Sequence, residues 1–162
     1  MLRVEYKNNI INIEEHVIKV IQNMRQEDPA DNESGGMLIG SVLSESNDVV
    51  IRDYTLPLKG DYQSRCRFIR KKQSHNALLQ EKWEESNKTV MYLGEWHTHP
   101  EMDPHYSQQD IRNWKKLLNK SNTFSDYLVF IIGGINFYKI WIGYRKKEDI
   151  VLVYKGAYNE NN

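Results

Sequence analysis

Three apolar segments rich in β-branched and aromatic residues constrain the fold most strongly, and they lie near the end of the chain, at residues 126–132, 137–144 and 150–154. Turn-forming residues separate them. Gly133-Gly134 lies between the first two, and the polar run 145–149 lies between the last two. Short apolar segments separated by such turns predict consecutive antiparallel strands. The chain is therefore expected to build a sheet.

The rest of the sequence alternates between strand and helix patterns. Further strands are expected at residues 2–6, 36–44, 49–58 and 89–99. Helices are expected from an Asn12-x-x-Glu15 capping box to about Arg25, across 71–86 with Ala77, Leu78, Leu79 and Trp83 on the apolar side, and after a cap at Ser107. Residues 60–70 are expected to be irregular, and 159–162 to form a frayed tail.

The length and the order of these elements predict one α/β domain. A chain of 162 residues can bury a single hydrophobic core. Hairpins are mixed with helices along the chain, so the expected architecture is a mixed β-sheet with helices packed on it, spanning residues 1–162.

The composition argues against several classes of protein. The chain has 22 basic and 22 acidic residues, so it lacks the excess of positive charge typical of nucleic-acid-binding proteins. No apolar run approaches the length of a membrane span, and the first residues show no signal-peptide pattern. Cys66 is the only cysteine, which excludes an internal disulfide and a multi-cysteine zinc site. We therefore expect a cytoplasmic protein that binds neither nucleic acid nor membrane.

The stretch 95–100, with the sequence EWHTHP, is the most informative about chemistry. Side chains two apart on a strand point to the same face. His97 and His99 would therefore lie side by side, about 7 Å apart at Cα, as a workable pair of zinc ligands. Pro100 cannot donate to a sheet and is expected to help end the strand there.

A third zinc ligand can be proposed from the helix that follows. Ser107 and Asp110 are spaced as a cap and the third residue of a helix, near the positive end of its dipole. The loop 100–106 is long enough to fold this helix start back over the strand end. Two imidazoles and one carboxylate leave a fourth position on zinc for water, which is the mark of a catalytic zinc site.

Such a water needs a carboxylate to take its proton and pass it to the leaving amine. Glu33 precedes Ser34-Gly35-Gly36, where two glycines permit close backbone approach and unusual dihedral angles. Glu95 lies on the same strand face as the two histidines, one pleat further along. The residues alone leave both carboxylates open as the base.

Each of these features alone has an ordinary explanation: a surface histidine pair, a helix cap or a loop acid. Their combination resembles the motif of the JAMM (MPN+/Mov34-like) zinc metalloproteases. The motif is carried here by Glu33 followed by His97-x-His99-Pro100-(six residues)-Ser107-x-x-Asp110. The stretches 33–40 and 94–101 look most like a bacterial subgroup associated with ubiquitin-like conjugation and anti-phage (CBASS-like) operons.

The resemblance implies an MPN/JAB-like fold and a role for each motif residue. His97, His99 and Asp110 would bind one Zn²⁺ ion with its water. Glu33, rather than Glu95, would be the general base and then the acid, and Ser107 would donate a hydrogen bond to the oxyanion. The implied activity is that of a zinc-dependent (iso)peptidase that removes or processes a ubiquitin-like modifier at its C-terminal tail. Its partners would be that modifier or its conjugates, including a conjugated defence enzyme.

Four further features are left with less definite roles. Glu95 would orient a neighbouring group. Tyr106 stands where many members of the family have proline, and His105 is either an extra ligand or a residue that fixes the loop. Residues 65–72 contain five basic side chains, which form either a solvated face or a wall of the substrate groove.

Alternative functions remain open at this stage. The same chemistry would serve a protease that trims a small sulfur-carrier protein in cofactor or cysteine biosynthesis. Relatives without the metal ligands are non-catalytic MPN scaffolds, but Glu33, His97, His99 and Asp110 are all present here. A role on DNA finds no support in the balanced charge.

Overall fold

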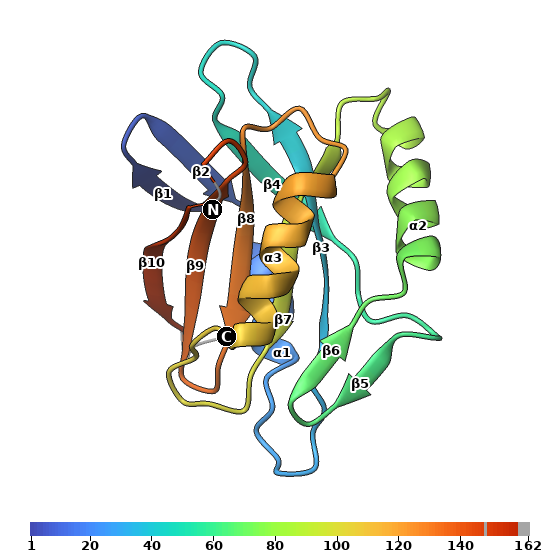
Figure 1. Ribbon diagram of the computed structural model, residues 1–162, viewed down its shortest axis with the longest axis vertical. Coiled ribbons are helices and arrows are strands. Elements are labelled where there is room, and N and C mark those ends of the chain that lie inside the picture. Colours follow the sequence, from blue (N-terminus) through green and yellow to red (C-terminus); the bar gives the residue numbers. More distant parts are fainter. Residues whose placement is uncertain (148, 159–162) are drawn as a thin grey trace.

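The computed structural model describes residues 1–147 and 149–158, within which eight strands form one curved sheet (Figure 1). The expected tail 159–162 and one residue of the expected turn 145–149 lie outside the described residues. The sheet curves until its ends approach each other, since the amide of Asn9 donates a hydrogen bond to the hydroxyl of Tyr144 (3.2 Å). The elements in chain order are β1 (Leu2–Tyr6), β2 (Asn9–Ile13), α1 (Glu15–Asn23), β3 (Gly35–Val42), β4 (Val49–Tyr54), β5 (Tyr62–Ser64), β6 (Arg67–Ile69), α2 (Lys72–Glu85), β7 (Met91–Thr98), α3 (Gln108–Lys120), β8 (Tyr127–Gly133), β9 (Phe137–Tyr144) and β10 (Ile150–Ala157).

The sheet is mixed, as the sequence predicts. Its strand order is β1-β2-β4-β3-β7-β8-β9-β10. The pairs β2–β4 and β7–β8 are parallel, and the other neighbouring pairs are antiparallel. The three late strands are confirmed as β8, β9 and β10. Among the described residues, no helix is long and apolar enough to cross a membrane.

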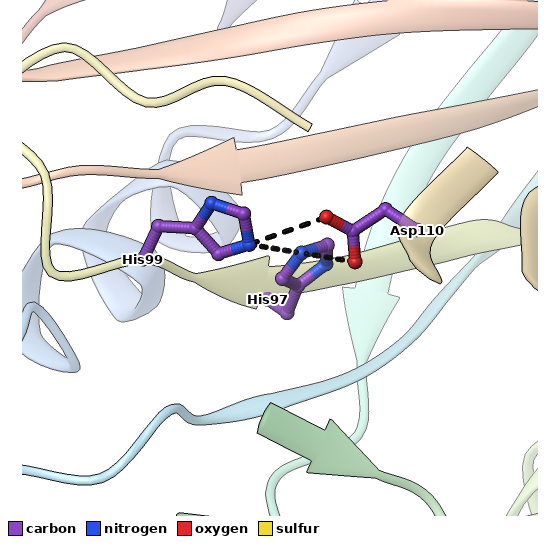
Figure 2. Close-up of side chains that lie close together, drawn as sticks. All are labelled: His97, His99 and Asp110. Atoms are coloured by element: carbon purple, nitrogen blue, oxygen red, sulfur yellow. Dashed lines mark hydrogen bonds and ion pairs between the residues drawn. The ribbon is translucent and has the colours of Figure 1, made fainter. Parts of the chain in front are cut away.

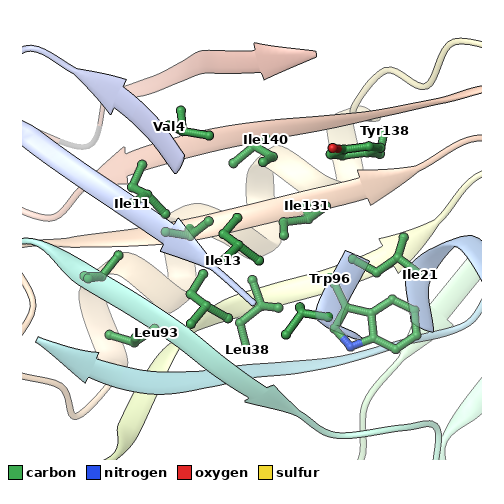
Figure 3. Close-up of a cluster of buried hydrophobic side chains, with 14 of the residues drawn as sticks. Val4, Ile11, Ile13, Ile21, Leu38, Leu93, Trp96, Ile131, Tyr138 and Ile140 are labelled. Carbon is green, nitrogen blue, oxygen red and sulfur yellow. The ribbon is translucent and has the colours of Figure 1, made fainter. Parts of the chain in front are cut away.

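Hydrophobic clusters cover both faces of the sheet. On one face, α1 contributes Val17, Val20 and Ile21 to the larger cluster, which Figure 3 shows together with Trp96 and Ile131. On the other face, α3 covers a smaller cluster (Figure 1). Every residue of β8 is buried because the strand is covered on both sides, which explains its uninterrupted apolar sequence.

The predicted capping box at Asn12 is wrong. Asn12 lies within β2, opposite Arg3 of β1 and Val50 of β4. The pairing of this strand on both sides outweighs the local capping preference, because tertiary contacts routinely override it. The helix begins instead at Glu15, after the extended residue Glu14 and without a side-chain cap.

The second helix is confirmed, but its buried side differs from the prediction. Ala77 is exposed, and the residue of α2 that is buried is His75. The Nδ1 atom of His75 lies 2.7 Å from Thr55 Oγ1, and its Nε2 atom lies 2.8 Å from Asp61 Oδ2. A polar network therefore attaches α2 to the body of the protein, and hydrophobic periodicity could not reveal it.

Residues 60–70 are also more regular than predicted, because β5 and β6 pair with each other as a separate hairpin. Their strands have three residues each and are mostly exposed. Such short, polar strands give almost no periodic signal. Figure 1 shows the hairpin beside the end of β7, across from the start of α3.

Gly94 sets the register of β7, the strand that carries the two histidines. Its φ of +148° is unusual for any other residue, and a Cβ atom here would lie 1.7 Å from the carbonyl oxygen of Val129. The pairing with β3 shifts at this point. As a result Trp96 faces the larger cluster, and its neighbours Glu95 and His97 point to the opposite face, beneath α3.

We expect Gly94→Ala to lower the free energy of unfolding by more than about 4 kcal/mol, because it adds backbone strain and a clash with a rigid neighbouring strand. The matched control is Gly60→Ala. Gly60 also has a positive φ, but its new Cβ would meet only the flexible side chain of Lys71, so the expected loss is about 1–2 kcal/mol. Urea denaturation measures both, and equal losses would contradict the clash with Val129.

Candidate metal centre

The two histidines and the aspartate expected to bind metal converge on one point (Figure 2). His97 Nε2 lies 3.1 Å from His99 Nε2. The carboxylate of Asp110 lies between the rings, with Oδ1 3.2 Å from His97 Nε2 and Oδ2 3.3 Å from His99 Nε2. Both histidines are buried. Thus β7, the residue just after it and the first turn of α3 bring the three donors together.

Asp110 is held in place by the start of its own helix. Ser107 caps α3, and its hydroxyl accepts a hydrogen bond from the backbone N–H of Asp110 (3.1 Å). In return the backbone N–H of Ser107 donates to Asp110 Oδ2 (2.6 Å). This predicted capping box is confirmed, and it also orients the carboxylate toward the histidines.

The loop 100–106 folds back because several groups attach it to the last strands. Asp103 forms ion pairs with Lys139 and Lys155, each at 2.9 Å, and these hold the pKa of Asp103 at about 2. The ring of Tyr106 packs edge-on against Trp114 and Trp141. The aromatic residue found in place of proline therefore fixes the loop by packing.

His105 does not join the metal-binding group. Its imidazole is exposed, and its Nε2 atom lies 3.3 Å from Lys139 Nζ. Its backbone N–H donates to Glu101 Oε2 (2.8 Å). Of the two expected roles for His105, the geometry favours that of a residue that fixes the loop.

The β5–β6 hairpin holds Glu33. The backbone N–H of Glu33 donates to Ser64 O (2.8 Å), and Gln63 Nε2 donates to Glu33 O (3.0 Å). A backbone hydrogen bond from Phe68 reaches the carboxylate. Glu33 is buried, and its Oε1 atom lies 3.7 Å from His99 Nε2. The hairpin thus presents this carboxylate to the cluster.

The two glycines after Glu33 are needed for close packing. A Cβ atom on Gly35 would lie 2.5 Å from the ring of Phe68, and one on Gly36 would lie 2.0 Å from Thr55 O. The expected close approach of the backbone is therefore present. The expected unusual dihedral angles are not, because neither glycine has a positive φ.

Glu95 is engaged by a different partner. Its Oε1 atom accepts hydrogen bonds from Arg70 Nε (3.0 Å) and Nη2 (2.7 Å). The side chains of Arg70 and Glu95 are only 9% and 14% exposed. This ion pair attaches the end of β6 to β7, so the group that Glu95 orients is Arg70.

The titration of these groups reflects their proximity. Burial raises the pKa of Glu33, although His97 and His99 act against this shift. Burial also acts to raise the pKa of Asp110, but hydrogen bonds from the two histidines hold it far below its usual value. Burial acts to lower the pKa of His97, yet the hydrogen bond and charge of Asp110 keep it above its usual value.

The donor set fits a tetrahedral zinc ion. Ligands about 2.0–2.1 Å from zinc lie roughly 3.3 Å apart in that geometry, and the three observed separations are 3.1, 3.2 and 3.3 Å. Two imidazole nitrogens this close cannot both be protonated without repulsion. Two imidazole nitrogens and one carboxylate directed at one point are a donor set that suits a divalent cation.

A cavity of about 530 Å³ opens onto the cluster. Its lining includes Glu33, both histidines, Ser107 and Asp110. The hairpin side of the cavity contributes Arg67, Phe68 and Ile69, and α3 contributes Trp114. The three candidate ligands, both candidate bases and Ser107 are therefore accessible from one space, large enough for an extended peptide segment.

Sequence reasoning missed the supports of the site. Gln63, Ser64 and Phe68 hold Glu33, yet they lie in a segment without periodicity. Thr98 also escaped notice. Its hydroxyl accepts from the backbone N–H of Ser34 (2.9 Å), next to Glu33. These contacts join segments far apart in the sequence, and no local spacing predicts them.

Comparisons with known proteins identify the family. Residues 14–144 match the family of prokaryotic homologs of the JAB domain. A CD-NTase/cGAS isopeptidase of Vibrio cholerae is 35% identical over 142 residues, which are 86% of this chain and 84% of the relative. A CD-NTase/cGAS isopeptidase of Escherichia coli is 32% identical over 146 residues, or 90% and 88% of the two chains.

One solved structure supports the fold alone. The solution structure of a protein from Desulfitobacterium hafniense superposes with a TM-score of 0.57 at 18% identity, over 88% of each chain. The matches together confirm the predicted family, its α/β fold and its expected class of activity, that of an isopeptidase. The chain belongs to the family of prokaryotic homologs of the JAB domain.

Proposed function

We propose that this protein is a zinc-dependent isopeptidase that releases a CD-NTase, the enzyme named in its relatives, from isopeptide conjugates in an anti-phage system. The observation that carries the proposal is the convergence of His97, His99 and Asp110 with the Glu33 carboxylate at the edge of the cluster. The names of the relatives support the choice of substrate.

His97, His99 and Asp110 would hold the zinc ion. A bound zinc ion would act as a Lewis acid, both on water and on the scissile carbonyl group. The protein leaves room for water and substrate, because the cavity opens onto all three donors. The hydrogen bond from the Ser107 N–H keeps the Asp110 carboxylate in its orientation.

Glu33 would transfer the proton. It would take a proton from the attacking water and deliver it to the leaving lysine amine, which is a general base step followed by a general acid step. Burial raises its pKa, which makes this carboxylate a better proton acceptor than an exposed glutamate. Its rigid attachment to the hairpin would keep it in place during both transfers.

Ser107 would stabilise the oxyanion. Its Oγ atom accepts a hydrogen bond from the N–H of Asp110, so the hydroxyl hydrogen is not used in that contact. The side chain lines the cavity beside the cluster. A hydroxyl in this position can donate to an oxygen that becomes negatively charged.

The zinc content of the purified protein tests the proposed ligands. Protein purified without added metal should contain about one zinc ion per chain, and His97→Ala should lower the zinc affinity more than about 100-fold. His105→Ala is the matched control, because this histidine lies outside the cluster, and it should retain the metal. Elemental mass spectrometry with chelator competition measures both. Full zinc content in His97→Ala would overturn the assignment of the ligands.

Substitution of the two carboxylates tests which of them is the base. Glu33→Gln should retain zinc and reduce kcat about 10²–10⁴-fold. The control is Glu95→Gln, which should keep turnover within about tenfold while losing stability, because Arg70 is left buried without its partner. If Glu95→Gln lost more turnover than Glu33→Gln, the roles would have to be exchanged.

The substrate is tested in native host cells that carry Glu33→Gln. Mass spectrometry of conjugates should show that lysine-linked adducts containing a CD-NTase accumulate relative to wild type. A build-up of an unprocessed sulfur-carrier protein, with no accumulated isopeptide adducts, would favour the trimming protease instead. No change in either class would favour a scaffold.

A further inference from the structure

The charged residues that line the cavity include two whose side chains have no partner. Apart from the histidines, the charged lining residues are Glu33, Arg67, Arg70, Lys72, Glu95, Glu101 and Asp110. Asp110 contacts both histidines, and Glu33 faces His99. Each of the other lining acids also has a partner: Arg70 for Glu95, and the N–H of His105 for Glu101.

Arg67 and Lys72 are different. Within residues 1–147 and 149–158, neither side chain forms a hydrogen bond, an ion pair or a ring contact. Both are exposed. Arg67 begins β6 and Lys72 begins α2. Together with residues 68–70, which also line the cavity, they form one wall of it. They are available to an acidic group that enters the cavity.

This wall is anchored close to the metal-binding strand. Arg70 lies between the two free cations in the sequence, and its buried ion pair with Glu95 attaches the wall to β7, two residues before His97. The β5–β6 hairpin, which leads into this wall, also holds Glu33 through Gln63 and Phe68. A substrate segment that lies along this side of the cavity would pass beside Arg67 and Lys72.

The balance of charge favours an acidic segment. The lining has four carboxylates and three Lys or Arg side chains. Once a divalent cation is bound among the donors, the net charge of the lining becomes positive. Arg67 and Lys72 would attract a negative side chain and repel a positive one, and their exposure makes both effects modest and dependent on salt.

We propose that Arg67 and Lys72 form a specificity subsite for an acidic side chain of the substrate, located close to the scissile bond. The inference rests on the proposed isopeptidase function and deepens it by naming a chemical feature of the substrate. An aspartate or glutamate in the seated segment pairs with the two cations, and a lysine at the same position is repelled.

A charge-swap experiment tests the subsite. The probes are synthetic isopeptide-linked peptides, in which a short tail is joined to the lysine side chain of a short acceptor peptide. Asp or Lys is placed at each position in turn, on both sides of the isopeptide bond. Wild-type protein should cleave the preferred Asp peptide with kcat/KM about three- to tenfold above its Lys counterpart, mainly through KM. The preference should shrink as salt increases.

The double variant Arg67→Glu, Lys72→Glu should reverse the preference, so that Lys peptides become the better substrates. Both positions are exposed, so folding should be preserved. Lys71→Glu is the matched control: it lies next to Lys72 but does not line the cavity, and it should leave the preference unchanged. Fluorescence anisotropy of labelled peptides on Glu33→Gln protein supplies a binding readout without turnover, and it should show the same order.

Equal cleavage and binding of the Asp and Lys peptides at every position would overturn the subsite and leave the isopeptidase function intact. An Asp preference that survives the double charge reversal would also overturn it. Failure of zinc-loaded wild-type protein to cleave any of the peptides or the cellular conjugates would overturn the proposed function itself, and the subsite with it.

Discussion

Two imidazole nitrogens and one carboxylate meet at a single point in this protein, and that arrangement could hold a metal ion. Much of the surrounding structure serves to bring these groups together. Gly94 sets the register of β7, so that His97 points beneath α3. The loop after the strand is fixed by ion pairs and aromatic packing, and it returns the chain to the start of α3, where Asp110 is oriented by its cap.

The two carboxylates that compete for the role of base are separated by their partners. Glu95 is neutralised by Arg70 in a buried ion pair, and it therefore stabilises the position of the hairpin. Glu33 is surrounded by hydrogen bonds from that same hairpin, and its carboxylate faces His99. One short hairpin thus holds the proposed base and lines the cavity where the substrate would lie. Arg65 and Arg67 of the hairpin are exposed, while Arg70, just after it, anchors the segment to Glu95.

The sequence predicted those parts of the site that depend on local spacing. Two histidines at alternate positions of a strand point to the same face. A serine three residues before an aspartate forms a capping box at a helix start. The same logic failed at Asn12, because pairing with β1 and β4 overrides a local cap. It also missed the hairpin and the burial of His75, because both depend on polar contacts between distant segments. The periodicity of hydrophobic residues along the sequence does not reveal such contacts.

X-ray absorption at the zinc edge, on protein purified without added metal, examines the metal centre most directly. We predict a four-coordinate ion with only nitrogen and oxygen donors at about 2.0–2.1 Å, and with the scattering pattern of two imidazole rings. Replacing His97 and His99 together should remove that pattern and the metal. A sulfur donor at about 2.3 Å, or an unchanged spectrum in the double variant, would show that zinc binds elsewhere and would contradict the proposed metal site.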